Sequence, residues 1–356
     1  MSATQTRRKR ILTGDRPTGK LHLGHYVGSL INRVKLQHEY ETFLLVADIQ
    51  ALTTHWERPE LLSQAVLDVT MDNLAVGIDP EVTTLCVQSM IPEIAELTVI
   101  YGLFTNMNKL RHNPTTKAEA IQYGYTHSDD LVAGFDQLTY GFFGYPLSQA
   151  ADITFVRADL VPVGEDQKPH IELTRDVVSK FNQLYGGGKE IIPLPEALIG
   201  EIPRLRALDG SAKMSKSLGN AIALADPPET VKEMVWKAVT DPAKIRKNDP
   251  GHPDICNVFA YHQIFQGTLN KTPDVVAEIE RDCKSGALGC VECKGRLTDY
   301  LNGMLAPIRD RRRPYEENPD RVRDILREGT KRARQEGRET LALVKEAMKI
   351  DYFRLD

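Results

Sequence analysis

The feature that most constrains the fold is a repeated alternation of short apolar runs with longer segments of helical periodicity. Three runs read as buried strands: "RILTG" (10–14), "TFLLVADIQAL" (42–52) and "TTLCVQS" (83–89). Between them, apolar residues recur at helical spacing, as in Val27, Leu30, Ile31 and Val34. Because alternating strands and helices favour parallel strands with right-handed crossovers, the sequence predicts an α/β fold with a doubly wound parallel sheet.

The same pattern divides the chain of 356 residues. The alternation stops from about 93 to 145, where the sequence is polar and mostly helical, and resumes with "ADITFVRADLVPVG" and "HIELTRDVVSKFNQLYG". From about 228 only helical patterns remain. We therefore expect a Rossmann-type domain over 1–227 with a helical insert at 93–145, followed by a helical domain over 228–356 whose last helix returns to the first domain.

Composition excludes several classes of protein. Hydrophobic residues make up 41% and charged residues 26% of the chain, and no apolar run is long enough to span a bilayer. The basic N-terminus lacks the apolar segment of a secretory signal. A net charge of -4 argues against a protein that coats nucleic acid non-specifically. We expect a cytoplasmic protein that binds neither membranes nor DNA and contacts RNA only locally.

Two histidines lie between the first predicted strand and its helix, in His22-Leu23-Gly24-His25. Ligands of doubly wound sheets bind beyond the carboxyl ends of the strands, and a helix N-terminus there attracts phosphate. Gly24 would let a nucleotide approach the backbone closely. Alternatively, the two imidazoles only cap the helix, which a bare histidine pair does about as often.

The loop "DGSAKMSKSLGN" (209–220) has no apolar face that a helix or strand would bury. Its lysines, Lys213 and Lys216, lie between glycines, so the loop is able to close over a polyphosphate and stabilise charge on a leaving group. Taken alone, the loop also fits an ordinary solvated surface segment. Together with the histidine pair, it indicates nucleotide chemistry.

A third group of polar residues lies on the predicted helix "YPLSQAAD". Tyr145, Gln149 and Asp152 share one helical face and suit the ammonium and a side-chain donor of an amino acid, although a solvated face has the same pattern. Further on, "VPVGEDQ" ends a strand, where Gly164, Asp166 and Gln167 lie at the place of a ribose or form a simple turn.

Four of the five cysteines gather in the last third of the chain. Cys283, Cys290 and Cys293 follow a C-x6-C-x2-C spacing, and 26 residues separate Cys256 from Cys283. In a reducing cytoplasm four thiols fit a metal better than disulfides, and either structural zinc or an iron–sulfur cluster is compatible with the spacing. Free buried thiols are a third alternative. Cys86, inside a strand pattern, reads as a core residue.

These motifs together carry a resemblance to a known family. "HLGH" and "KMSKS" are similar to the two signatures of class I aminoacyl-tRNA synthetases, and "TGDRPTGKLHLGH", "YPLSQAADI", "VPVGEDQ" and "KMSKSLGNAI" resemble bacterial tryptophanyl-tRNA synthetases. The resemblance extends from about residue 9 to 350. It implies a Rossmann catalytic domain with a dimerisation insert, a helical anticodon-binding domain and a homodimer that binds tRNA(Trp).

The resemblance also implies a reaction and its residues. The carboxylate of L-tryptophan attacks the α-phosphate of Mg²⁺-bound ATP, and the 2′-hydroxyl of the terminal adenosine of the tRNA then accepts the aminoacyl group. The implied catalytic residues are His22, His25, Lys213 and Lys216. The implied ATP-binding residues are Arg16, Thr18, Gly24, Gly164, Asp166, Gln167, Met214 and Ser215. Asp152 accepts the indole N–H, and the ammonium is held by Tyr145, Gln149 and Gln167.

The cysteine segment is similar to that of a subset of these enzymes that bind a [4Fe-4S] cluster through four cysteines. By this resemblance Cys256, Cys283, Cys290 and Cys293 bind such a cluster, with zinc as the less favoured occupant.

Three alternatives remain beside this interpretation. Tyrosyl-tRNA synthetases share a helix like that of Tyr145, Gln149 and Asp152, but they supply a tyrosine from the first strand, which here reads Ile11-Leu12-Thr13. A small-molecule nucleotidyltransferase also uses a turn like HLGH but usually lacks a helical tRNA domain. A redox-sensing module with vestigial catalysis would not need both intact signatures.

Two basic clusters have no firm assignment. The first, in the insert, is read as an acceptor-stem contact or a solvated helix face and comprises Lys109, Arg111, His112 and Lys117. The second is read as a contact with anticodon phosphates or a solvated helix end and comprises Arg309, Arg311, Arg312 and Arg313.

Overall fold

The computed structural model describes residues 7–128, 130–134, 136–200, 205–211, 214 and 219–353. The chain forms two compact units. The first unit comprises Met1–Gly19, Asn32–Gly200 and Asn318–Asp356, and the second comprises Lys20–Ile31 and Glu201–Glu317. In this division residues 20–31 and 201–227 are grouped with the helices over 228–317, and the functional domains with a boundary at 227 and 228 stay a prediction.

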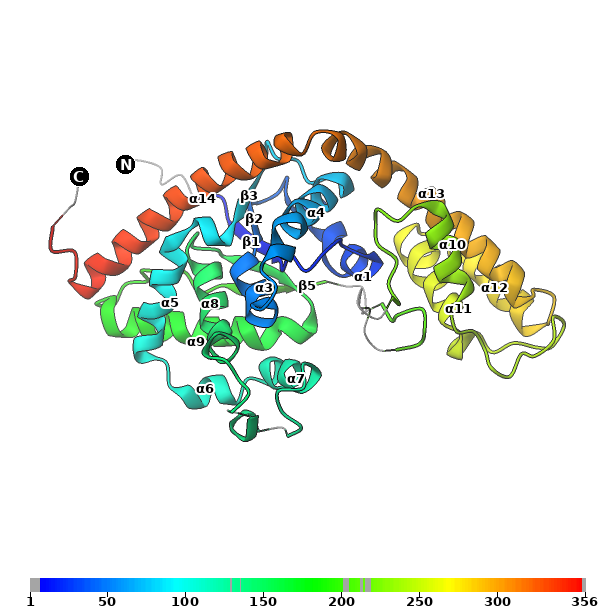
Figure 1. The fold of residues 1–356 in the computed structure, drawn as a ribbon, viewed down its shortest axis with the longest axis horizontal. Helices are drawn as coiled ribbons and strands as arrows, with labels where there is room; N and C mark the ends of the chain where they lie inside the picture. The colour runs from blue at the N-terminus through cyan, green and yellow to red at the C-terminus, as the bar shows by residue number, and fades with distance from the viewer. Residues whose placement is uncertain are drawn as a thin grey trace. The chain divides into compact units, whose positions relative to one another are not determined.

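The first unit is built on a five-stranded parallel sheet in the order β3-β2-β1-β4-β5 (Figure 1). The strands are β1 (Arg10–Asp15), β2 (Glu41–Val46), β3 (Thr83–Val87), β4 (Leu160–Val163) and β5 (Glu196–Ile199). In β2, Phe43, Leu44, Leu45 and Val46 are all buried, as expected for a parallel strand with both faces covered. The predicted α/β fold with a parallel sheet is therefore confirmed.

Helices follow the strands in alternation. The helices of this unit are α2 (Ile31–Leu36), α3 (Asp48–His55), α4 (Glu60–Val76), α5 (Pro92–Phe104), α6 (Met107–Arg111), α7 (Pro114–Gln122), α8 (Tyr140–Thr154), α9 (Lys168–Tyr185) and α14 (Pro319–Met348). The second predicted strand was too long, because β2 ends at Val46 and α3 already begins at Asp48. The predicted helix over 145–152 lies within α8, which continues to Thr154.

The strand order creates a switch point between β1 and β4. From β1 the chain passes to β2 and β3 on one side, and later to β4 and β5 on the other side. β1 and β4 pair at Ile11 and Leu160, so their carboxyl ends are neighbours. Crevices at such points are where doubly wound sheets bind ligands.

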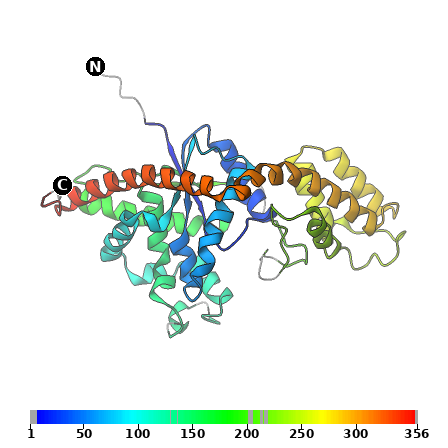
Figure 2. The same cartoon turned by 45° about the horizontal axis from the view of Figure 1, so that its top comes forward.

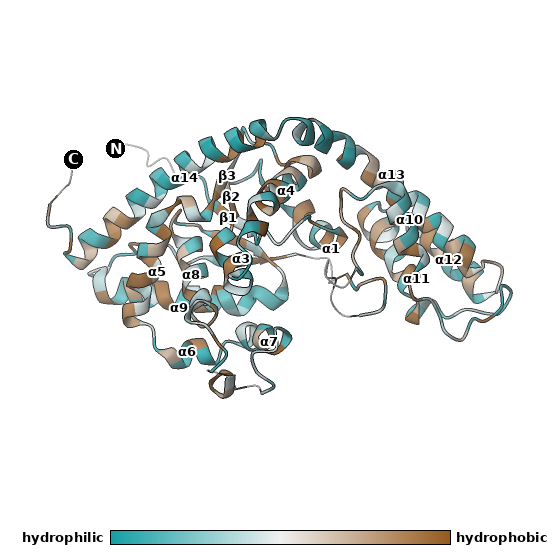
Figure 3. Cartoon of the chain, in the orientation of Figure 1, coloured by the Kyte–Doolittle hydropathy of each residue, from teal (hydrophilic) through white to brown (hydrophobic). Residues whose placement is uncertain are grey.

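Helix α14 covers the edge strand β3 (Figures 1 and 2). The backbone N–H of Val87 donates a hydrogen bond to Oγ1 of Thr330, at 3.1 Å. At Gly329 the two backbones approach so closely that a Cβ would lie 1.9 Å from the carbonyl oxygen of Leu85. In Figure 3 most of α14 is hydrophilic, whereas the strands behind it are hydrophobic. α14 therefore shields a sheet edge that would otherwise expose unpaired backbone groups.

The second unit is helical. Its helices are α1 (Leu23–His25), α10 (Pro228–Trp236), α11 (Asn257–His262), α12 (Pro273–Lys284) and α13 (Cys290–Glu317), with a π-helix at Tyr26–Leu30 after α1. Phe259, Val276, Ile279 and Leu288 form a small core between α11, α12 and α13. Among the described residues of the whole chain, no helix is both long and apolar enough to cross a membrane.

Candidate functional site

The HLGH segment forms the start of a helix, and its two imidazoles take part in that start. Nδ1 of His22 accepts a hydrogen bond from the backbone N–H of Gly24 at 3.1 Å, and Nδ1 of His25 accepts one from the N–H of His22 at 3.2 Å. The ring centroids lie 3.9 Å apart. Helix capping is thus one role of both side chains, and it fixes the orientation of the two rings at one place.

At Gly24 of the HLGH segment, Met214 of the KMSKS loop packs against the backbone. A Cβ at this position would lie 2.9 Å from Cε1 of His22 and 3.1 Å from Sδ of Met214. Any larger residue would therefore push the imidazole or the buried Met214 side chain out of place. Lys213, Ser215 and Lys216 lie outside the described residues.

The backbone just after the loop also pairs with the HLGH segment. His22 and Ala223 form an antiparallel bridge, flanked by hydrogen bonds from Leu23 N–H to the Ile222 carbonyl and from Leu224 N–H to the Leu21 carbonyl, at 3.0 and 2.9 Å. Two segments that are about 200 residues apart in the sequence therefore lie side by side.

The two ends of the loop are joined at its base. Asp209 Oδ1 accepts hydrogen bonds from the N–H and hydroxyl of Ser211, and Asp209 Oδ2 accepts one from Nδ2 of Asn220 at 3.0 Å. These donors hold the pKa of Asp209 below its usual range. Sequence analysis did not single out Asp209 or Asn220, although an Asp and an Asn at opposite ends of a Gly-rich loop are a recognisable turn signal.

Predicted nucleotide-binding residues follow the two central strands of the first unit. Arg16 comes directly after β1 and donates from Nη2 to Oε1 of Glu119 in α7, at 2.9 Å. The N–H of Thr18 donates to the carbonyl of Arg16 in a tight turn. After β4, Nε2 of Gln167 donates to Oδ2 of Asp166 at 3.2 Å. A Cβ on Gly164 would lie 2.8 Å from Oδ1 of Asp166 and would force that carboxylate to turn.

Helix α8 presents Tyr145, Gln149 and Asp152 on one face, as predicted from their spacing. The hydroxyl of Tyr145 is buried and lies 3.1 Å from Nε2 of His170 and 3.3 Å from Oγ1 of Thr116. Gln149 is half-buried. The tyrosine end of this face is therefore polar and enclosed.

His170 is a site residue that sequence analysis missed. Oδ1 of Asn113 accepts from the backbone N–H groups of Thr115 and Thr116, which turns its Nδ2 toward Nδ1 of His170. Nε2 of His170 is then the protonated nitrogen and donates to Tyr145. Burial lowers the pKa of His170 to about 4, which keeps the ring neutral. A histidine inside a helical pattern gave no sequence signal of its own.

Glu119 was missed as well. Its Oε1 accepts from Arg16, whereas its Oε2 is buried and meets the distance and angle limits of a hydrogen bond with none of the described residues. The carboxylate acts on Tyr145 by raising the pKa of the phenol, which burial has already raised. An acceptor of this kind beside Tyr145 suits a cationic group.

At the other end of the face, the carboxyl of Asp152 is enclosed by two amides. Oδ1 accepts from Nε2 of Gln88 at 2.7 Å, and Oδ2 accepts from Nε2 of Gln50 at 2.9 Å. Burial raises the pKa of Asp152 to about 7, and the two amides act in the opposite direction. Gln50 and Gln88 were not predicted, although each closely follows a buried strand, which is where ligand-facing polar residues are expected.

The basic cluster of the insert is partly neutralised within its own unit. Lys109 pairs with Asp176 at 2.8 Å, and Arg111 pairs with Asp130 at 2.7 Å. The hydrogen bonds from Arg111 contribute to the lowered pKa of Asp130. The charge of Lys117 also lowers the pKa of Asp130, and the side chain of His112 makes no hydrogen bond or ion pair with the described residues.

The arginines of 309–313 also have internal partners. Arg309 donates to the carbonyl of Asp226 at 3.0 Å, and Arg312 is almost fully buried and pairs with Glu316 at 2.6 Å. Arg313 pairs with Asp310 at 3.0 Å, and the charge of Arg311 acts on Tyr26. Arg309 thereby ties α13 to the chain just after the KMSKS loop.

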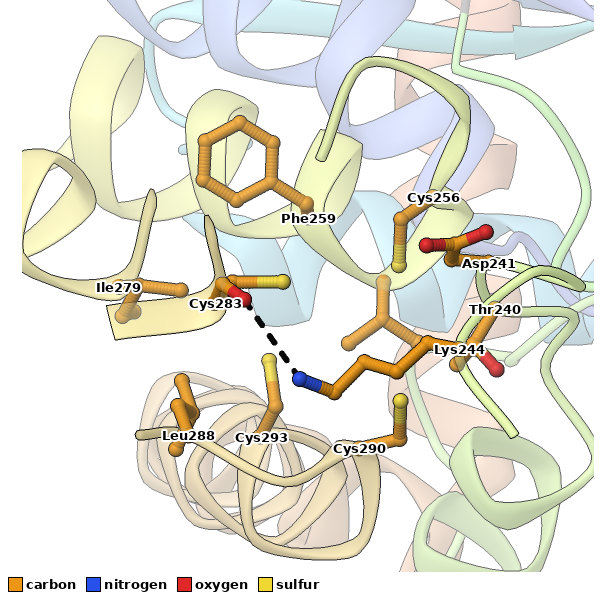
Figure 4. A pocket seen from close by; sticks show the side chains of 11 residues that line it. Thr240, Asp241, Lys244, Cys256, Phe259, Ile279, Cys283, Leu288, Cys290 and Cys293 are labelled. Atoms are coloured by element: carbon orange, nitrogen blue, oxygen red, sulfur yellow. Dashed lines mark hydrogen bonds between the residues drawn. The ribbon is translucent and has the colours of Figure 1, made fainter. Parts of the chain in front are cut away.

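The four clustered cysteines line one small cavity of about 20 Å³ (Figure 4). Cys256 caps α11, Cys283 lies near the end of α12, and Cys290 and Cys293 lie in the first turn of α13. Apolar side chains complete much of the wall, namely Val258, Phe259, Ile279 and Leu288. Burial and the neighbouring thiols raise the pKa of Cys293 to about 12. Cys86, by contrast, is fully buried in β3, as predicted.

The four thiols are of the donor type that thiolate-bound metal groups use. Cys256 and Cys283 also have raised pKa values, so without a cation these thiols stay protonated at neutral pH. The buried ammonium of Lys244 and the carboxylate of Asp241 also border the cavity. Within the described part of the chain, no three His, Cys, Asp or Glu side chains are arranged to hold one metal ion.

The chain is similar to known proteins in sequence and in structure. Residues 4–306 match the family model described as tRNA synthetases class I (W and Y). A Tryptophan–tRNA ligase of Streptococcus mutans is 48% identical over 96% of this chain and 98% of its own length. One from Aquifex aeolicus is 39% identical over 96% of this chain and its full length. Tryptophanyl-tRNA synthetase from Campylobacter jejuni, solved with ADP and tryptophan, superposes with a TM-score of 0.80 at 30% identity, over 96% and 99% of the two chains.

Proposed function

The chain belongs to the class I tRNA synthetases for tryptophan and tyrosine and is a tryptophan–tRNA ligase, and from this premise we propose which of its residues carry out the reaction. Tryptophan reacts first with ATP to give tryptophanyl-adenylate and pyrophosphate. The 2′-hydroxyl of the terminal adenosine of tRNA(Trp) then takes the tryptophanyl group. The observation that carries the proposal is the packing of Met214 against Gly24, which joins the two signature segments.

We assign the phosphate chemistry to His22, His25, Lys213 and Lys216. Charge develops on the α-phosphate and the departing pyrophosphate, and preorganised donors lower the barrier by binding that charge more strongly in the transition state than in ATP. ATP is a substrate with Mg²⁺ as its counter-ion. The other ATP contacts proposed are Arg16, Thr18, Gly24, Gly164, Asp166, Gln167, Met214 and Ser215.

Tryptophan is assigned to the face of α8. In this proposal Asp152 accepts the indole N–H, while Tyr145, Gln149 and Gln167 bind the ammonium. The buried acceptor on Glu119 supports a cationic group at the tyrosine end. A carboxylate left unpaired in this pocket would reject phenylalanine strongly. Tyrosine is disfavoured because β1 offers Ile11, Leu12 and Thr13 rather than a tyrosine to a substrate hydroxyl.

The experiment that tests these assignments is Lys216→Ala in tryptophan-dependent ATP–pyrophosphate exchange. Because the ammonium acts on the transition state, kcat should fall by about a hundredfold or more, while the Kd of tryptophan stays within about twofold. Lys237→Ala, a lysine just after α10, is the matched control and should keep the parent rate. Equal exchange in the Lys216 variant and the parent would remove the loop from the mechanism.

Recognition of tRNA is assigned to the helices over 228–317. Beside the cysteine cavity lies a groove of about 360 Å³ lined by Lys244, Ile245, Arg246, Lys247, Gly289, Cys290, Val291 and Glu292. Ile245 and Val291 are exposed by 87% and 68%, so apolar and cationic groups meet on one surface. This combination suits an unstacked base and its phosphate, which supports an anticodon contact. ATP and tRNA are cytoplasmic substrates, so we infer the cytoplasm as the compartment.

For the cysteine cavity we propose a [4Fe-4S] cluster held by Cys256, Cys283, Cys290 and Cys293. Four thiols around one cavity whose wall is largely apolar support it. Such a cluster would supply fixed charge and cross-linking to this unit rather than chemistry in the ligation. Anaerobically purified protein should contain about four irons per chain and absorb near 400 nm, and chelation should destabilise the helical unit. A content of one zinc and no iron per chain would instead indicate a structural zinc site.

A further inference from the structure

Three buried side chains from different elements meet at the indole-binding end of α8. Gln50 lies in α3, Gln88 follows β3 directly, and Asp152 lies in α8. Their exposed fractions are 7%, 3% and 4%. Asp152 is the proposed contact of the substrate, whereas the two glutamines have no role in the mechanism so far.

The direction of the hydrogen bond between Gln88 and Asp152 is fixed by the backbone. The N–H of Gln50 donates to Oε1 of Gln88 at 3.0 Å. Since a backbone N–H only donates, the oxygen of the Gln88 amide must face it, and the nitrogen must face Asp152. The contact of 2.7 Å between Nε2 of Gln88 and Oδ1 of Asp152 is therefore an N–H donating to the carboxylate.

Both oxygens of Asp152 accept from amides, since Nε2 of Gln50 donates to Oδ2 at 2.9 Å. If the carboxyl were protonated, its O–H would point at an N–H donor and one of the two hydrogen bonds would be lost. The amide pair therefore favours the ionised form against the cost of burial.

Other ionisable groups around Asp152 act in the opposite direction. The carboxylate of Asp48, at the start of α3, raises the pKa of Asp152, as burial does. The thiol of Cys86 in β3 is also influenced by Asp152, and its own pKa is raised by burial and by that charge. Tyr101 of α5 bonds to Thr154, and burial raises the pKa of its phenol, so it stays neutral. The two amides are the recorded groups that lower the pKa of Asp152.

We propose that Gln50 and Gln88 are positioning residues that hold Asp152 as an acceptor-only carboxylate, and that this pair sets the preference for an amino acid whose aromatic ring carries an N–H. The inference rests on the proposed contact between Asp152 and the indole. An indole N–H then finds an oriented acceptor, whereas a ring without N–H gains nothing from it.

The test compares tryptophan with its benzothiophene analogue, in which sulfur replaces the indole N–H, by ATP–pyrophosphate exchange from pH 6 to 9. In the parent, the ratio of the two kcat/KM values should fall as the pH drops below about 7, because a protonated Asp152 no longer accepts. In Gln88→Met and Gln50→Met the midpoint of this fall should move up by about one pH unit. At pH 7 the ratio should then be about fivefold lower, with little change in kcat/KM for the analogue.

Gln37→Met is the matched control. Gln37 is an equally buried glutamine of the same unit that donates to the Gly77 carbonyl and does not touch Asp152. Its variant should lose stability but keep the parent ratio and midpoint.

The outcomes separate the two claims. Suppose that Gln50→Met and Gln88→Met both fold, lower kcat/KM equally for the two substrates and leave the midpoint in place. The glutamines are then merely structural. Asp152→Asn tests the underlying contact: an unchanged ratio there would remove the indole contact itself. If the preference for tryptophan over the analogue falls in Asp152→Asn but not in the two methionine variants, only the role of the glutamines is overturned.

Discussion

At the residue scale, the site depends on side chains whose orientation is fixed by backbone groups. The N–H groups of Thr115 and Thr116 orient Asn113, Asn113 fixes the tautomer of His170, and His170 donates to Tyr145. Each step follows from a donor that has no alternative role. The phenol that is proposed to bind the substrate ammonium is therefore positioned from behind by a neutral imidazole.

Burial of His170 predicts how stability depends on pH. Its pKa in the folded chain, about 4, lies below the unfolded value of 6.5, so the unfolded state binds more protons between these values. Stability from this group is complete above pH 6.5 and is lost as the pH falls toward 4, by about 2 kcal/mol at pH 4.5. Urea unfolding of His170→Gln should show a smaller loss from pH 7 to 4.5 than the parent. The exposed His38→Gln variant serves as control, and an identical loss in both variants would contradict the prediction.

The close packing at Gly24 predicts a loss of catalytic rate without a loss of tryptophan binding. In Gly24→Ala the new methyl group meets His22 and Met214, and the ring and the loop must shift by a few tenths of an ångström or more. Since misplacement on this scale weakens transition-state contacts, kcat for exchange should fall at least about tenfold. The Kd of tryptophan, measured by calorimetry, should stay within about twofold. Gly28→Ala, where a methyl group meets nothing within 4 Å, is the control. Parent kcat in Gly24→Ala would argue that the packing with Met214 does not matter.

At the element scale, the contact between α14 and β3 joins the end of the chain to the sheet. Thr330 satisfies the N–H of Val87 on an edge strand, and Gly329 lets the helix backbone approach. A glycine in the middle of a helix normally lowers stability relative to alanine. Here the close approach to Leu85 reverses that preference.

Gly329→Ala should therefore destabilise the first unit, by about 3 kcal/mol or more, because its Cβ would overlap the Leu85 carbonyl and force α14 away from β3. The control is Gly102→Ala in α5, where a methyl group meets nothing within 4 Å and stability should be unchanged or higher. Urea unfolding measures both. Similar stability of the two variants would mean that α14 is not held at this point.

Comparison of the predicted and observed strands shows which of them a sequence pattern can locate. Continuous apolar runs predicted β1, β2 and β3 because parallel strands are buried on both faces. β5 escaped notice because its four residues are only half-buried or exposed, so no apolar run marks it. The end of β2 was placed too late because Ala47, Ile49 and Ala51 continue the apolar pattern into α3. Tertiary contacts, rather than local preference, decide that boundary.

At the scale of the whole molecule, spacing within a segment was enough to group Tyr145, Gln149 and Asp152 on one helical face. The four clustered cysteines line one cavity, and the metal group expected there stays a prediction. Gln50, Gln88, Glu119 and His170 could not be found in this way, because each comes from a different element and becomes a neighbour only in the folded chain. The assignment of 20–31 to the unit of the C-terminal helices also depends on long-range backbone pairing with 222–224.

Exposed apolar residues on and beside α5 predict where two copies of the chain would associate. α5 exposes Val99 and Leu103 by 65% and 72%, with Met90 and Met107 exposed beside its two ends. Such a patch in the insert supports the homodimer proposed from the family. Leu103→Asp should lower the mass in sedimentation equilibrium from about two chains to one, because a charge would be buried in the interface. Ile245→Asp, at an exposed apolar residue of the second unit, should leave the mass unchanged; a dimeric Leu103→Asp protein would place the interface elsewhere.

The central claim is that this chain activates tryptophan with ATP, and amino-acid-dependent ATP–pyrophosphate exchange tests it most directly. The purified chain is assayed with tryptophan, tyrosine and phenylalanine in turn. The account predicts saturable exchange with tryptophan and kcat/KM at least about a thousandfold lower for the other two, as expected of a buried acceptor that reads an N–H. Exchange supported equally well by tyrosine, or no exchange with tryptophan, would contradict it.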